Sequence, residues 1–110
     1  MSVTLFDRAE LLENLDGDAE FADSILGDAQ VEIPKDVAQL KALCSGEELH
    51  SIRVCAHTIK GMASNLCAPA LRDAAFAIEG AARDGDLEGA RAALSELEKI
   101  AVMTVEAIKA

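Results

Sequence analysis

The chain has 110 residues, of which 51% are hydrophobic and 3% aromatic, and its formal net charge is -10. This length suits one domain with a single hydrophobic core, so we expect residues 1–110 to form a single domain. The excess of acidic residues would repel phosphate backbones and anionic lipids, which excludes nucleic acid and membrane surfaces as expected partners.

The composition favours helices and a cytoplasmic location. Alanine and leucine are frequent, whereas there are two prolines and no Tyr or Trp, which predicts an all-α fold. The amino-terminal MSVTLFDRAE lacks the basic start and apolar run of a signal peptide, so we expect a soluble, cytoplasmic protein. Cys44, Cys55 and Cys67 are odd in number and lack CxxC spacing, which favours buried thiols over disulfides or a zinc site.

The first two predicted helices fill the amino-terminal part of the chain. Thr4 can cap a short helix that runs to about Leu15, before the turn-like DGD at 16–18. Asp18 can cap a second helix, whose apolar residues recur at helical spacing as far as the CSGEE stretch. Pro34 lies inside it and should bend or break it, because proline lacks an amide donor.

A third helix is predicted from about Gly46 to Leu66, because Ser45 followed by Glu48 is a capping-box pattern. At about 100° per residue, its apolar residues gather on one core face. That face consists of Leu49, Ile52, Ala56, Ile59, Ala63 and Leu66. His57 lies about 140° from the centre of the face and should therefore be exposed. The same outer strip carries Arg53, Lys60, Gly61 and Ser64.

Two further helices complete the predicted fold. Ala68-Pro69 should end the third helix and start a fourth, which ends near Asp84-Gly85. Asp86 can cap a fifth helix, whose apolar stripe continues to the end of the chain. Four longer helices joined by short turns predict an antiparallel up-down four-helix bundle, with the short first helix packed across one end.

The outer strip of the third helix has the residues of a reactive site. An exposed neutral imidazole offers a ring nitrogen that can attack an electrophile such as a phosphoryl group. Lys60 and Arg53, one turn away on either side of His57, could neutralise the resulting charge, and Gly61 would let another protein approach closely. From the residues alone, His57 is a reactive or docking histidine, and an ordinary solvated histidine remains the alternative.

The stretch AHTIKGMASNL closely resembles the signature of histidine-containing phosphotransfer (HPt) domains. The resemblance continues in FDRAELLENLDGDAEFADSIL before it and LRDAAFAIEGAARDGD after it. It implies a helical bundle in which His57 is the phosphoacceptor, Lys60 supports the phosphoryl group and Gly61 clears space for a receiver domain. One departure is Cys67, at the position ten residues after the histidine where the family usually has glycine.

The resemblance also implies a function. We expect a phosphorelay intermediate in which His57 accepts a phosphoryl group from one receiver domain and passes it to another. Its partners would be response-regulator receiver domains and a sensor or hybrid histidine kinase, with Arg53 and Ser64 contacting the partner. The sequence has no nucleotide-binding glycine motif, so we expect a phosphocarrier without autokinase activity or a cofactor of its own. We also expect a monomer. The receiver would supply Mg²⁺.

Three other interpretations compete with this one. Glu47 and His50 form one Glu-x-x-His pair, but a di-iron site needs two copies facing inward, and this pair falls on the outer face. Cys55 could act as a nucleophile with His57 as its base, but the two lie about 160° apart around the helix axis. The last alternative is a helical adaptor that only docks a signalling partner and is never phosphorylated.

Overall fold

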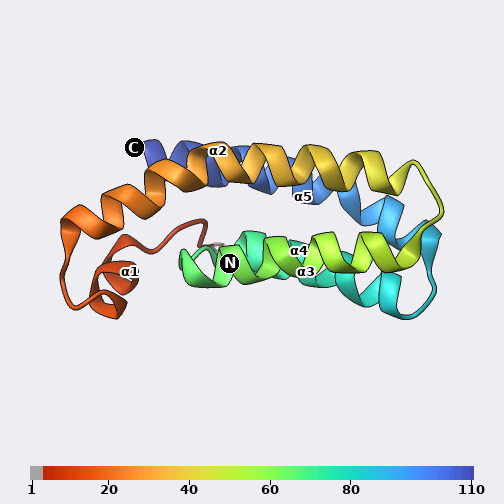
Figure 1. Cartoon of the computed structure of the whole chain (residues 1–110), viewed down its shortest axis with the longest axis horizontal. Helices are drawn as coiled ribbons and strands as arrows, with labels where there is room; N and C mark the ends of the chain where they lie inside the picture. Colours follow the sequence, from red (N-terminus) through yellow and green to blue (C-terminus); the bar gives the residue numbers. More distant parts are fainter. Residues whose placement is uncertain (1–3) are drawn as a thin grey trace.

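The computed structural model describes residues 4–110 of the chain, and its elements within that range are five helices (Figure 1). In chain order they are α1 (Arg8–Asn14), α2 (Ala19–Cys44), α3 (Leu49–Asn65), α4 (Pro69–Arg83) and α5 (Leu87–Lys109). Helices α2 to α5 run back and forth in a bundle of 43 × 29 × 20 Å, and α1 packs against α2 at one end. The predicted all-α bundle is therefore confirmed.

The core lies between the four long helices. Helix α3 packs against α2 and α4, while α5 packs against α2 and α4. The apolar stripes meet at the centre because each recurs every three or four residues. The largest fully buried side chains are Leu11, Ile33, Leu40, Ile52, Ile59, Leu71, Ile78, Leu97 and Thr104. Within residues 4–110, no helix is both long and apolar enough to cross a membrane.

The first helix begins later than predicted. Its N-cap is Asp7, whose Oδ1 accepts a hydrogen bond from the Glu10 amide at 3.0 Å. Thr4 is not the cap, because α1 begins four residues later, at Arg8. The Thr4 carbonyl instead accepts a hydrogen bond from the Ala70 amide at 3.2 Å. That amide belongs to the first turn of α4 and has no partner within its own helix. The segment before α1 therefore satisfies the start of α4 instead of extending α1.

Helix α2 is continuous through its proline. Asp18 caps it as predicted, with Oδ1 accepting from the Phe21 amide at 3.0 Å. The helix extends from Ala19 to Cys44 with Pro34 inside it, so it is not broken there. Figure 1 shows that its N-terminal part (orange) slopes toward α1.

The capping box predicted at the start of α3 is wrong. Helix α3 begins at Leu49, after Glu48, which makes no side-chain capping hydrogen bond. Ser45 instead ends α2, where its hydroxyl donates to the Ala42 carbonyl at 2.7 Å. Its backbone keeps helical dihedral angles, whereas an N-cap residue needs a non-helical backbone.

The two later helix starts match their sequence signals. Pro69 is the first residue of α4, where its missing amide hydrogen costs nothing. Asp86 caps α5, with Oδ1 accepting from the Gly89 amide at 2.8 Å. The short α3–α4 turn brings these two helices side by side as an antiparallel hairpin, and this hairpin carries the candidate site.

Candidate functional site

His57 lies on the outer face of α3, as its position in the helical pattern predicts. The neighbouring residues Ala56 and Ile59 are completely buried, whereas the His57 side chain is 65% exposed. The predicted core face is confirmed except at Leu49, which is half-buried at the first turn of the helix. The imidazole is therefore accessible to another protein.

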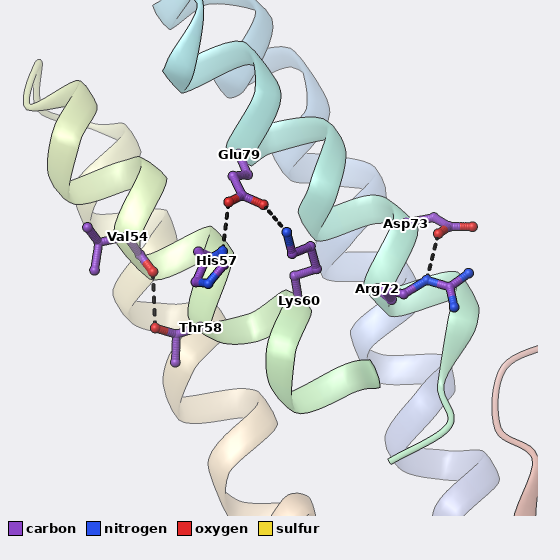
Figure 2. Close-up of polar contacts among 7 residues, drawn as sticks. All are labelled: Val54, His57, Thr58, Lys60, Arg72, Asp73 and Glu79. Carbon is purple, nitrogen blue, oxygen red and sulfur yellow. Dashed lines mark hydrogen bonds and ion pairs between the residues drawn. The ribbon is translucent and has the colours of Figure 1, made fainter. Parts of the chain in front are cut away.

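A carboxylate from the neighbouring helix holds the imidazole (Figure 2). Glu79 of α4 places Oε2 2.7 Å from His57 Nδ1 and Oε1 2.7 Å from Lys60 Nζ. Its side chain is only 16% exposed, although both of its partners lie on the outer strip of α3. Oε1 is shielded from solvent and has no hydrogen bond of good geometry within residues 4–110, so its contact with Nζ is a close ion pair.

Glu79 was missed by the sequence reasoning, which examined α3 alone. A signal was available in the spacing around the α3–α4 turn. His57 lies ten residues before Cys67, and Glu79 lies twelve residues after it. Residues at similar distances from the turn of a helical hairpin lie at the same level, so an outward-facing residue of α4 near this position should meet the histidine.

The charge state of Glu79 fixes the chemistry of the ring. The Lys60 ammonium beside it holds the pKa of the carboxyl below its usual range, and the hydrogen bond with His57 acts in the same direction against the opposing effect of burial. An ionised carboxylate can only accept, so Nδ1 of a neutral His57 must donate its proton to Oε2. Nε2 then carries the lone pair and is the nucleophilic nitrogen.

The Lys60 side chain contacts two residues of α4. Besides the ion pair with Glu79, its Nζ lies 5.1 Å from the centre of the Phe76 ring, a cation–π distance. The lysine side chain is 26% exposed, whereas Phe76 of α4 is 52% exposed. The structure thus brings His57 and Lys60 together through one carboxylate, beside an accessible aromatic ring.

Gly61 faces open space. A Cβ atom built at this position would meet no atom within 4 Å outside the helix's own local backbone. The bundle itself therefore does not require glycine here, although glycine in a helix interior costs about 1 kcal/mol relative to alanine. Ser64, one turn further along the same strip, is exposed. Both residues are available to a partner that approaches His57.

Arg53 lies on the other side of His57 and shares a concavity with it. This hollow, of about 300 Å³, is lined by Arg53, Val54, His57, Thr58 and Glu79. The Thr58 hydroxyl is already used, because it donates to the Val54 carbonyl at 3.0 Å. Arg53 is exposed and makes no ion pair with any residue in 4–110.

The structure does not assemble the competing sites. Glu47 and His50 are both exposed, and residues 4–110 contain no group of three or more His, Cys, Asp or Glu side chains that could hold a metal ion. Cys55 is buried, its thiol donates to the Asp36 carbonyl at 3.7 Å, and burial raises its pKa. A protonated, buried thiol is a poor nucleophile, and its hydrogen bond is to α2, whereas His57 contacts Glu79 of α4.

Cys67 stands where HPt domains usually have glycine, and its backbone has a conformation that favours glycine. Its φ is +60°, in the left-handed region that glycine adopts without steric cost. It is buried at the end of α3, its carbonyl accepts from the Asp7 amide at 2.9 Å, and its sulfur accepts from Asn14 Nδ2 at 3.5 Å. The substitution therefore changes packing against α1 and leaves the His57 face untouched.

Known proteins match this chain in family and in fold. Residues 24–107 match the family model described as Hpt domain. The crystal structure of histidine-containing phosphotransfer protein B (HptB) from Pseudomonas aeruginosa PAO1 superposes with a TM-score of 0.87 at 24% sequence identity, covering 98% of this chain and 94% of that one. No curated protein sequence matches the chain significantly. Because the family match extends over most of the chain, this protein belongs to the Hpt domain family and is a phosphotransfer domain of phosphorelay signalling.

Proposed function

We propose that this chain is a phosphorelay intermediate that carries a phosphoryl group on Nε2 of His57 from one receiver domain to another. The observation that carries the proposal is the contact of Nδ1 with the ionised Glu79. That contact fixes the tautomer and leaves Nε2 as a lone-pair nitrogen on a ring that is 65% exposed.

The proposed step conserves atoms and charge. The Nε2 lone pair attacks the phosphorus of an aspartyl phosphate, an N–P bond forms, and the O–P bond to the aspartate breaks. The receiver carboxylate leaves with the electron pair. The ring keeps its Nδ1 hydrogen and becomes cationic, and Glu79 accepts a hydrogen bond from it throughout, which stabilises the charge. Transfer to the second receiver is the reverse of this step.

The surrounding residues have separate proposed roles. Lys60 neutralises Glu79 and so supports the charges of the phosphorylated site, while Gly61 leaves room for the receiver beside the ring. Arg53 and Ser64 contact the docked receiver from the same strip. The receiver brings Mg²⁺ and most of the phosphoryl-transfer machinery, and the kinase activity belongs to a sensor or hybrid histidine kinase. We further propose that the chain works as a monomer.

The test is transfer from a receiver domain labelled on its aspartate with ³²P. The wild-type chain should take up label that is acid-labile, comparatively base-stable and located on His57 by mass spectrometry. His57→Gln should retain the helical circular dichroism spectrum and take up none, whereas His50→Gln should behave like the wild type because His50 lies outside the concavity. Label on another residue would contradict the assignment to His57, and receiver binding without any label would favour the non-phosphorylated adaptor.

A further inference from the structure

We propose that Arg53 is the side chain of this chain that contacts the phosphoryl group on His57, and that Lys60 acts one step removed, through Glu79. The proposal rests on the proposed function of His57 as the phosphoacceptor. It goes beyond a docking role for Arg53, because it places the guanidinium on the transferred group itself.

The first argument is that Lys60 is already engaged. Its Nζ is 2.7 Å from Glu79 Oε1 and 5.1 Å from the Phe76 ring centre. Glu79 occupies the Nδ1 side of the imidazole, and Figure 2 shows Lys60 reaching toward that carboxylate. A phosphoryl group on Nε2 would project from the ring in a different direction. To reach it, Lys60 would have to leave a buried carboxylate oxygen uncompensated, which is costly.

The second argument concerns the donors around the concavity beside His57. Val54 is apolar there, the Thr58 hydroxyl donates to its own helix, and Glu79 is an anion. Arg53 remains as the cation, without an ion pair to any residue in 4–110. It precedes His57 by four residues, a spacing that puts the two Cβ atoms about 5–6 Å apart on one helix face. The guanidinium fork can then contact two phosphoryl oxygens at once.

The third argument is charge balance. Glu79 and Lys60 cancel each other, and a cationic ring offsets one of the two negative charges of the phosphoryl group. One negative charge then remains next to the Glu79 carboxylate, in a chain whose net charge is already -10. Arg53 supplies the missing positive charge on the open side of the ring. During transfer it would contact oxygens that stay on phosphorus while the O–P bond breaks and the N–P bond forms.

The test compares Arg53→Gln and Arg53→Lys with a matched control, Lys99→Gln. Lys99 is an exposed lysine of α5 that makes no ion pair within the described residues and does not line the concavity, so its replacement changes the net charge equally. Phosphoramidate, which releases ammonia as it phosphorylates histidine, can load His57 without any receiver. Titration by ³¹P NMR should then show a higher phosphoryl pKa in Arg53→Gln than in the wild type or Lys99→Gln, because the neighbouring cation is lost.

The second readout is the equilibrium between phosphorylated receiver and phosphorylated His57. A docking residue changes forward and reverse rates equally and leaves this equilibrium constant unchanged. A residue that contacts the bound phosphoryl group changes it, and Arg53→Gln should shift it toward the receiver by about 5- to 20-fold, with partial recovery in Arg53→Lys.

An unchanged equilibrium constant with both rates reduced would overturn the proposal, as would equal shifts in Arg53→Gln and Lys99→Gln. Either result would leave the phosphoacceptor role of His57 intact. Absence of label on wild-type His57 in the receiver assay would instead remove the proposed function, and the phosphoramidate titration would still report on Arg53 separately.

Discussion

Arg91 and Glu79 each contact a neighbouring part of this bundle through a charged side chain, and they bind different kinds of partner. Arg91 of α5 donates from Nε to the Cys44 carbonyl at 2.8 Å and from a terminal nitrogen to the Gly46 carbonyl at 2.9 Å. Glu79 of α4 instead holds side chains of α3, including the His57 imidazole. One of these contacts binds main chain and the other binds side chains.

The difference separates folding from chemistry. The Cys44 carbonyl is in the last turn of α2, where helical carbonyls have no partner of their own, so Arg91 satisfies groups that the fold leaves open. The His57 imidazole is largely exposed and water could solvate it, so the fold does not need Glu79 for that purpose. We therefore expect loss of Arg91 to lower stability and loss of Glu79 to impair transfer.

The largest effect should come from Gly61→Gln, which tests the site without altering the contacts of Arg91 or Glu79. Glutamine is a good helix former, so the variant should be more stable by about 0.5–1 kcal/mol. Its side chain would project beside the imidazole and should lower transfer and receiver binding at least about tenfold, the loss expected from a steric clash at a partner surface. Melting temperature and transfer rate measured on the same sample separate the two effects.

Gly27→Gln is the matched control for that variant. Gly27 is an exposed glycine inside α2, and a Cβ built there also meets no atom within 4 Å. The Gly27→Gln variant should gain the same stability as Gly61→Gln and should transfer at the wild-type rate. If Gly61→Gln transferred as well as Gly27→Gln does, Gly61 would have no docking role.

Glu79→Gln should sharpen the chemical side of the comparison. The amide oxygen can still accept from Nδ1, but the negative charge that supports a cationic ring is lost, so transfer should slow about tenfold. Asp73→Asn makes the same carboxylate-to-amide change on an exposed residue of α4 and should leave the rate unchanged. Equal rates in both variants would show that the charge of Glu79 is irrelevant to transfer.

The contribution of Glu79 to stability should depend on pH. In the folded protein the pKa of the Glu79 carboxyl lies below the ordinary 4.5, chiefly because of its contact with Lys60. A carboxyl whose pKa is lower in the folded state adds stability that is complete above the ordinary value and disappears as pH falls through the folded value. The difference in urea unfolding between wild type and Glu79→Gln should therefore be complete at pH 6 and should shrink progressively as pH falls below 4.5.

Arg91→Gln should lower stability without impairing transfer. Two backbone carbonyls lose a charged donor, and the hydrogen bond to the Cys44 carbonyl is partly buried, so the free energy of unfolding should fall by about 1–2 kcal/mol. Transfer at temperatures where the variant is folded should match the wild type. Arg83→Gln, which removes an exposed pair with the adjacent Asp84, should barely change the melting temperature. A loss of transfer in folded Arg91→Gln would contradict the separation of the two contacts.

The smallest effect should come from replacing Cys67, which lies in the turn between α3 and α4. Replacement by alanine removes the buried sulfur but keeps a Cβ at φ +60°, whereas replacement by glycine removes both. Cys67→Gly should therefore be more stable than Cys67→Ala by about 1 kcal/mol, the cost of a left-handed backbone for a non-glycine residue. Urea midpoints of the two variants measure this difference, and the reverse order would rule out backbone strain at this position.

Local sequence signals correctly predicted the helix starts at which no other group of the protein binds the signal residue. Pro69 marks the start of α4 because the first helical position needs no amide hydrogen. Asp86 marks the start of α5 because its partner, the Gly89 amide, lies in the first turn of the same helix. Ser45 has an equally strong local signal, but its hydroxyl is taken by the Ala42 carbonyl. Thr4 is not the cap because α1 begins only at Arg8, while the backbone of Thr4 pairs with the distant Ala70 amide at the start of α4.

The candidate site likewise has a part that one helix determines and a part that depends on the packing of two helices. The exposure of His57 follows from the periodicity of one helix, which the sequence contains completely. The contact with Glu79 depends on the register between two helices, and that register is set by the packing of buried residues such as Ile59 and Ile78. The same periodicity predicted that Arg53 is exposed, and its exposure is confirmed. The contact of Lys60 with Glu79 could not be predicted in this way, because it depends on the position of α4.

The three buried thiols have a practical consequence. Cys44, Cys55 and Cys67 are all less than 10% exposed, and burial raises the pKa of each, so an alkylating reagent should reach them only when the surrounding structure opens. They lie in three different places: the end of α2, the middle of α3 and the α3–α4 turn. Alkylation of the wild-type chain followed by peptide mapping would therefore measure separately how often each of these regions opens. The measurement can be made with the phosphoryl group present or absent.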